Sequence, residues 1–237
     1  MNAKKLSFLL LILVAVACTN RSTSSEQDEM RHWNNVLQQI NALLLENKAR
    51  QTLDLAKQTL PEILESAEKN GTTDTLIYHA RKIFNACGNN YINTKQYKDG
   101  IDYMDSIGNH PLIREHCPHE LLSFKAGLNQ LYGNNPEAVR LAEDYLQLPV
   151  CTSANDFIRQ AEIISGVYMY SGNNLPKAIQ ILEKAIDVYR KGGNFPNMLR
   201  IMSRLGIYYH LSGEYEKAIA TNQEAIATYN DSIAPEM

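Results

Sequence analysis

Four glycines recur along the sequence at an almost constant spacing. Gly88, Gly127, Gly166 and Gly206 are separated by 39, 39 and 40 residues. A repeat length of this size indicates stacked supersecondary units, in which each unit covers the apolar face of its neighbour. We therefore expect an array of similar units rather than one irregular core, and no period-two alternation predicts β-strands.

Each repeat is predicted to contain two helices, because apolar residues around Gly206 recur every three to four positions. Compact residues follow the glycines at fixed distances: Gly100, Val139, Ala178 and Ala218 at twelve, and Ile107, Leu146, Ala185 and Ala225 at nineteen. Gly166 and Ala178 should let the two helices of a pair approach closely. One more pair is expected near Met30–Glu46 and Ala49–Lys69, with Ala56 as its small residue.

Two segments carry a family resemblance. Leu205-Gly-Ile-Tyr-Tyr209, continued by Ser212-Gly-Glu-Tyr-Glu-Lys-Ala218, and Leu175-Pro-Lys-Ala178 resemble tetratricopeptide repeats. The usual period is about 34 residues, so this chain is similar to the longer variant of bacterial signalling proteins. Glu162 and Ser123 depart from the family, which has large apolar residues there. The resemblance implies an all-α, right-handed α-solenoid of about five tetratricopeptide-like helix pairs, with a concave groove and no catalysis.

In that family the first helix of each pair lines the groove, which takes an extended or helical peptide. Helical offsets place these groove residues on the first helices: Lys82, Asn85, Asn89, Asn93, Phe124, Tyr132, Gln160, Tyr170, Arg200, Ser203 and His210. For Phe124, Leu128 and Val167 the alternative is packing between repeats. Because Phe124 and Leu128 replace the polar groups of the family's carboxylate-binding arrangement, we do not expect capture of a peptide C-terminus.

The N-terminal segment predicts export. Its apolar run, Leu6 to Ala17, follows two lysines and is too short for a membrane span, which needs roughly 20 residues. Ala15-Val-Ala-Cys18 resembles a bacterial lipoprotein signal, with Ala15 where that family has Leu, and the alternative is an ordinary cleaved signal. The expected organisation is a signal peptide (1–17), lipidated Cys18 with a flexible tether (18–29), and the repeat domain (30–237).

This organisation predicts a location outside the cytoplasm. The resemblance implies acyl chains such as palmitate on Cys18 and anchoring to the bacterial cell membrane, with the outer membrane expected, facing the periplasm or the cell surface. A formal net charge of −3 gives no basic surplus for nucleic acid or an anionic lipid surface. Contact with the membrane is therefore expected through the lipid alone.

Residues that could carry chemistry are few. His116, Cys117 and His119 lie close together, but a zinc site usually needs four ligands from two elements. The alternative, a loop before a helix near Pro118, is preferred, and we predict no metal, no cofactor and no enzyme. Cys87 is expected in the core. A disulfide between Cys117 and Cys151 stays open, because export permits it but spacing does not establish it.

The last predicted helix, near Tyr215–Tyr229, carries Ile219 and Ile226 without a capping helix after it in this sequence. Either that face is tolerated, or it docks on another chain as in a homodimer, or the chain is a shortened relative of a longer signalling protein. The expected function is a protein-binding scaffold or adaptor at the cell envelope, with an unidentified peptide or protein partner. The alternative is an extracytoplasmic sensor module without its own output domain.

Overall fold

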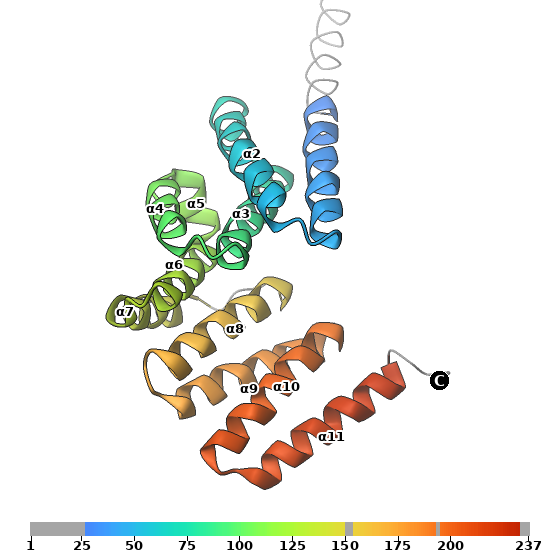
Figure 1. The fold of residues 1–237 in the computed structure, drawn as a ribbon. Coiled ribbons are helices and arrows are strands. Elements are labelled where there is room, and N and C mark those ends of the chain that lie inside the picture. The colour runs from blue at the N-terminus through green and yellow to red at the C-terminus, as the bar shows by residue number, and fades with distance from the viewer. Residues whose placement is uncertain (1–26, 150–153, 193–194, 233–237) are drawn as a thin grey trace, which may run out of the picture. The chain divides into compact units, whose positions relative to one another are not determined.

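The computed structural model of the chain describes residues 27–149, 154–192 and 195–232, which form helices joined by turns (Figure 1). These ranges contain no strand. No helix within them combines the length and apolar character that crossing a membrane requires. After a first helix at residues 27–45, the elements are α2 (Ala49–Asn70), α3 (Asp74–Asn93), α4 (Tyr97–Ile107), α5 (Pro111–His116), α6 (Pro118–Tyr132), α7 (Asn135–Gln147), α8 (Ala154–Tyr170), α9 (Leu175–Gly192), α10 (Phe195–Ser212) and α11 (Tyr215–Ser232).

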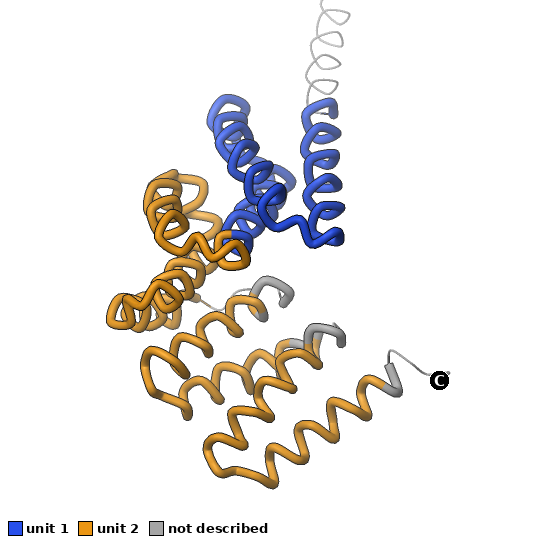
Figure 2. The backbone as a smooth tube through the Cα atoms, in the orientation of Figure 1, with its two compact units in different colours: residues 1–90 blue, residues 91–237 orange. Residues whose placement is uncertain are grey.

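The chain separates into two compact units, residues 1–90 and residues 91–237 (Figure 2). The predicted signal peptide (1–17) and Cys18 lie outside the described residues. The tether was predicted to reach residue 29, whereas residues 27–29 are already helical. The helical part therefore begins at least three residues earlier than the sequence pattern indicated.

The first unit buries one side of each of its helices. Trp33 and Ile40 of the first helix are buried, and Ala56 of α2 is fully buried, in agreement with its predicted place at a close helix contact. Polar side chains add contacts between helices. His79 Nε2 of α3 lies 3.0 Å from Asn34 Oδ1 of the first helix, so the first helix is part of the folded unit.

The second unit consists of helix pairs stacked on one another. α6 pairs with α7, α8 with α9, and α10 with α11, while α8 also packs on α6 and α10 on α9. Gly127, Gly166 and Gly206 lie in the first helices of these pairs, so the predicted all-α repeat fold is confirmed. The short helix α5 was not predicted. His110 caps it, because its Nδ1 accepts a hydrogen bond from the Leu112 backbone N–H at 3.2 Å.

The second helices follow a period of 40 residues, which corrects the predicted register. They begin at Asn135, Leu175 and Tyr215. In α7 the fully buried small residue is Ala138 rather than Val139, and Tyr145 is buried where Leu146 was expected. The step from Gly127 to its second helix is one residue shorter than in the later pairs, which explains the shift.

Gly127 and Gly166 occupy equivalent positions in the repeat but have different surroundings. A Cβ on Gly127 would lie 2.7 Å from Ile163 Cγ2, so α6 and α8 approach too closely for a side chain there. A Cβ on Gly166 would meet no heavy atom of another residue's side chain or of a neighbouring helix within 4 Å. The predicted close helix contact is therefore wrong for Gly166, whereas Ala178 is fully buried as expected.

Alanine substitutions at these two glycines should have opposite effects. We expect Gly166→Ala to raise the free energy of unfolding by up to about 1 kcal/mol, because Ala is a better helix former and has room. Gly127→Ala should lower it by about 1–3 kcal/mol through overpacking against Ile163. Urea unfolding followed by circular dichroism measures both, and a Gly127→Ala variant at least as stable as the parent would contradict the close contact.

A recurring group of three side chains connects successive pairs of the second unit. Lys177 of α9 pairs with Glu143 of α7, with its Nζ 2.6 and 2.8 Å from the two carboxylate oxygens. The same Nζ lies 4.6 Å from the ring centre of Tyr168 in α8. Burial and the nearby Glu143 carboxylate both raise the pKa of Tyr168. Lys177 thus pairs with a carboxylate of the preceding helix pair and lies against a tyrosine ring of its own pair.

The next pair places the same three residue types together, with a different set of hydrogen bonds and with Lys217 paired to Glu214. The Tyr209 hydroxyl of α10 donates to the Glu183 carboxylate of α9. Lys217 Nζ of α11 lies 5.3 Å from the centre of the Tyr209 ring. These three residues follow their counterparts by 40, 41 and 40 positions, so the lysine–tyrosine contact recurs with the repeat.

The Lys177–Glu143 pair predicts a pH-dependent contribution to stability. The hydrogen bond from Lys177 lowers the pKa of the Glu143 carboxyl below its usual value of 4.5. The contribution of the pair to stability is therefore present at neutral pH and is lost as the pH falls through the folded-state pKa. Because the Glu143 side chain is about half exposed, Glu143→Gln should cost less than about 1 kcal/mol at pH 7. The cost should shrink toward pH 3.

Urea unfolding at the two pH values, with exposed Glu216→Gln as the control, measures this difference. An equal loss of stability at pH 7 and pH 3 would show that charge is not the cause.

Candidate functional site

The predicted groove residues do not all reach the surface. Phe124 of α6 is 1% exposed and Gln160 of α8 is 3% exposed, so the prediction is wrong for both as partner-binding residues. Gln160 Oε1 instead accepts a hydrogen bond from the Tyr145 hydroxyl at 3.2 Å. Leu128 and Val167 are also buried. Because α6 packs on α7 and α8, only a narrow strip of each first helix stays accessible.

Other predicted residues are accessible. In the second unit Asn93, Tyr132, Tyr170, Arg200, Ser203 and His210 are exposed. In the first unit Lys82, Asn85 and Asn89 are partly buried on α3, and Lys82 Nζ lies 5.4 Å from the ring centre of Tyr78. α8 and α10 are the first helices of two adjacent repeats. We use the name α8–α10 face for a set of their residues that consists of accessible side chains and the buried Glu162: Glu162, Tyr170, Arg200, Ser203, Arg204 and Ile207.

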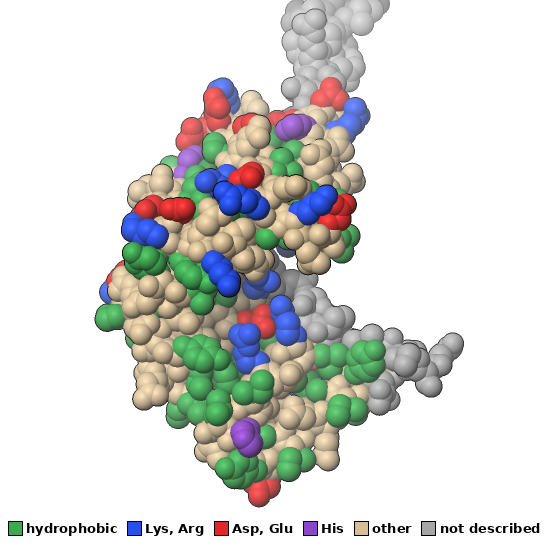
Figure 3. All heavy atoms as spheres, in the orientation of Figure 1, with side chains coloured by type: hydrophobic (Ala, Val, Ile, Leu, Met, Phe, Trp, Pro, Cys, Tyr) green, Lys and Arg blue, Asp and Glu red, His purple; other side chains and the backbone are tan. Residues whose placement is uncertain are grey.

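A buried carboxylate lies at the centre of this face. Glu162 is 7% exposed, as befits a position where the family has a large apolar residue. Arg200 Nη2 lies 2.8 Å from Glu162 Oε2, and Arg204 Nη1 donates to the backbone carbonyl of Glu162 at 3.2 Å. Figure 3 shows basic side chains next to an acidic one where α8 and α10 lie. α10 thus holds two guanidinium groups beside a single carboxylate of α8.

A third arginine, Arg159 of α8, lies one turn before Glu162. Burial lowers the pKa of Arg159 on α8, and the positive charge of Arg200 lowers it further, while Glu162 acts in the opposite direction. Burial also raises the pKa of Tyr208, and the charge of Arg204 partly offsets that shift. These shifts place Arg159, Arg200, Arg204 and Tyr208 within electrostatic reach of Glu162.

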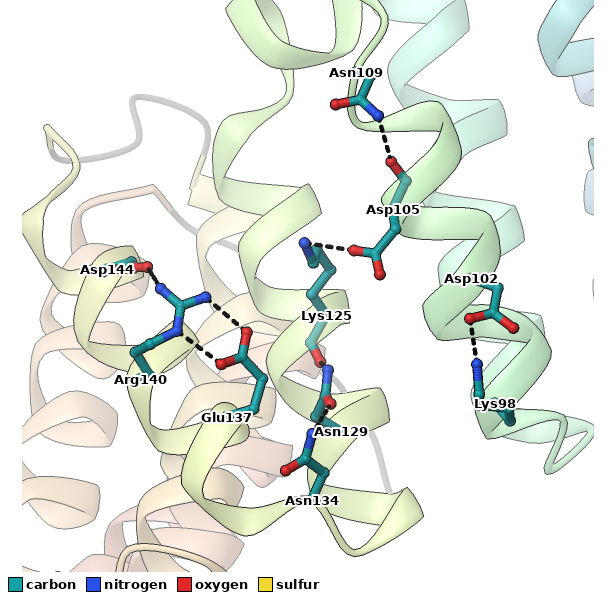
Figure 4. Close-up of polar contacts among 10 residues, drawn as sticks. All are labelled: Lys98, Asp102, Asp105, Asn109, Lys125, Asn129, Asn134, Glu137, Arg140 and Asp144. Atoms are coloured by element: carbon teal, nitrogen blue, oxygen red, sulfur yellow. Dashed lines mark hydrogen bonds and ion pairs between the residues drawn. The ribbon is translucent and has the colours of Figure 1, made fainter.

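The ion pairs of α4, α6 and α7 have at least one carboxylate for each cation (Figure 4). On α7 the Arg140 guanidinium donates to Glu137 from Nε at 2.7 Å and from Nη2 at 2.6 Å, and from Nη1 to Asp144 at 2.6 Å. Lys125 of α6 pairs with Asp105 of α4 at 2.6 Å. Arg140 therefore binds two carboxylates, whereas Arg200 and Arg204 together lie near a single carboxylate, that of Glu162.

Apolar and aromatic side chains flank the arginines. Tyr170, at the end of α8, is 69% exposed, and Ile207, one turn after Ser203 on α10, is also exposed. Aromatic residues and arginine are enriched among the side chains that dominate binding energy at protein interfaces. The α8–α10 face therefore combines the residue types of an interaction surface with an excess of positive charge.

A second accessible surface lies between α10 and α11. A hollow of about 460 Å³ is lined by Ser203, Gly206, Ile207, His210, Tyr215, Ala218, Ile219 and Asn222. Ile219 and Ile226 are 58% and 63% exposed, whereas their counterparts in α9, Ile179 and Ile186, are 6% and 3% exposed where α10 packs on that helix. α11 thus exposes isoleucine side chains at the positions where α9 buries them.

The histidine and cysteine candidates lie elsewhere in the fold. Cys87 and Cys117 are buried, and Cys151 lies outside the described residues, so the question of a Cys117–Cys151 disulfide stays open. His119 Nε2 lies 2.7 Å from the carbonyl oxygen of Pro149, while His116 ends α5. Within the described ranges no three His, Cys, Asp or Glu side chains are grouped to hold a metal ion.

Sequence reasoning missed the arginine arrangement. Glu162 was identified only as a departure from the repeat pattern, and Arg159 and Arg204 were not identified at all. A signal was present, because Glu162 occupies an otherwise apolar position with Arg159 one turn before it and Arg200 about one repeat later. A charge in an apolar position of a repeat predicts an opposite charge in the adjacent repeat.

Comparisons with known proteins agree with this fold. Residues 161–231, which include the whole α8–α10 face, match the tetratricopeptide repeat family. No curated protein matches the chain. Two solved structures of a Podosopora anserina protein, described as a kinesin light chain with nearly identical TPR-like repeats, are similar to it.

One of these structures carries a single substitution. It has 14% identity and a TM-score of 0.54 and covers 84% of this chain and 95% of its own. The form without that substitution has 12% identity and a TM-score of 0.52 and covers 84% and 96%. At this level of identity the likeness shows the helical-repeat fold alone.

Proposed function

We propose that this protein is a non-catalytic scaffold that binds a peptide or protein partner on the α8–α10 face. The observation that carries the proposal is the exposure of Tyr170, Arg200 and Ile207 on adjacent first helices, next to the buried charge of Glu162. The match of residues 161–231 to the tetratricopeptide repeat family supports it. Such faces take extended or helical segments.

The proposal includes attachment to the bacterial cell envelope, with Cys18 as the lipidated residue. It rests on the sequence of residues 1–18, which lie outside the described structure. Lipid anchoring would concentrate a captured partner at the membrane. The exposed side of α11, with Ile219 and Ile226, is proposed as the contact for a second copy of the chain.

The binding proposal can be tested in cells with a photo-activated cross-linking residue. Placed at position 170 or 203, it should trap the same partner, whereas position 180, exposed on the second helix α9, should not. Tyr170→Ala should reduce the yield from position 203 severalfold, because an exposed aromatic side chain supplies much of the contact. Tyr229→Ala, which removes an exposed tyrosine from α11, is the matched control.

Equal trapping at positions 170, 203 and 180 would contradict the proposed face. Trapping that requires an added small molecule would favour the alternative, an extracytoplasmic sensor module that responds to a ligand. Trapping without one favours the scaffold.

Replacement of the predicted lipidated cysteine tests the anchor. Cys18→Ser should move the protein from the membrane fraction to the soluble fraction, because no acyl chain can then attach to that position. Fractionation and immunoblotting measure the distribution, with Cys87→Ser as a control that leaves the N-terminal segment intact. A Cys18→Ser variant that remains in the membrane fraction would refute lipid anchoring at this residue.

A further inference from the structure

The charges on the α8–α10 face point to the chemistry of its ligand. Arg200 pairs with Glu162, and its side chain stays about half exposed. Arg204 donates to the carbonyl of Glu162 rather than to its carboxylate and makes no ion pair with a described acidic residue. One carboxylate therefore lies beside two guanidinium groups, and the exposed donors of these groups face solvent.

The arrangement holds these donors in place. Arg200 and Arg204 are one helical turn apart on α10, and the contacts with Glu162 fix both to α8. A guanidinium group offers several N–H donors in a rigid plane that suits carboxylate oxygens. Because Glu162 fixes the guanidinium groups, a ligand would lose little side-chain entropy in using the remaining donors.

The flanking residues favour a protein segment over a small anion. Ile207 and Tyr170 offer exposed apolar surface beyond the arginines, toward the C-terminal ends of α10 and α8. Inorganic phosphate would use the charges but not this apolar surface, whereas a peptide with both acidic and apolar side chains would use both.

We propose that the α8–α10 face binds acidic side chains of a peptide or protein segment through Arg200 and Arg204, with its apolar residues against Tyr170 and Ile207. This inference rests on the proposed function and specifies its ligand class. Glu162 acts as an internal competitor: it positions the guanidinium groups and also repels an incoming carboxylate.

The test uses the full chain and a dye-labelled peptide with alternating Glu and Leu residues and an amidated C-terminus. Fluorescence anisotropy should show binding that weakens as NaCl rises. Peptides with Gln or Lys in place of Glu should bind at least about tenfold more weakly, because they lack the carboxylates that the guanidinium groups recognise. An amidated end is used because the proposal concerns side-chain carboxylates and not a chain terminus.

Three variants are predicted to change the peptide affinity in three different ways. Arg204→Gln should weaken binding by about five- to tenfold, the effect of one charged contact. Glu162→Gln should strengthen it severalfold, because it removes the repelling charge and keeps a hydrogen-bonding side chain. Arg140→Gln, at an arginine that Glu137 and Asp144 already engage, should leave the affinity unchanged. Circular dichroism establishes that each variant is folded.

Several results would overturn the inference. These are equal affinities for Arg204→Gln and Arg140→Gln, weaker binding by Glu162→Gln, or equal binding of the Glu and Lys peptides. Displacement of the peptide by millimolar inorganic phosphate would assign the face to phosphate groups instead. Partner trapping at position 170 without binding of the acidic peptide would refute this ligand class and leave the proposed function intact.

Discussion

Helix pairs of the second unit, the α10–α11 pair excepted, bury an apolar side by packing against the pair that follows. Ile179 and Ile186 of α9 are buried where α10 packs on that helix, and the matching residues of α11 are exposed. The other features of the unit serve this stacking. Small residues such as Ala178 allow close contact, and the Glu143–Lys177 pair connects one pair to the next. Stability in such an array is the sum of contacts between neighbours, so each pair depends on the one beside it.

Much of this fold could be predicted from residue spacing. The glycine period identified the first helices, because a repeated unit repeats its close contacts. The environment of each glycine could not be predicted, since spacing cannot distinguish the tight contact at Gly127 from the room around Gly166. The register of α7 was also missed, because a turn one residue shorter moves the buried positions to Ala138 and Tyr145.

The candidate site was predicted less well, for a physical reason. Helical offsets identify which residues share a face, but the exposure of that face depends on the helices around it. Tyr170 and Arg200 are accessible, whereas Phe124 and Gln160, which were placed on the same face, are buried. Periodicity could not separate these cases, since both sets repeat with the first helices and differ only in how neighbouring pairs cover them.

The identity of residue 162 connects the stacking to the proposed binding. One repeat later the same position is Met202, which is fully buried, so an apolar side chain fits the stack there. A buried ion pair is seldom more stabilising than apolar packing of similar volume, because both charges lose their hydration. Stacking alone therefore does not account for a glutamate at this position. The carboxylate does fix the Arg200 guanidinium at the surface of α10, next to Arg204, which the backbone carbonyl of residue 162 holds. A positioned arginine beside a second one suits the recognition of an anion, the role proposed for this face.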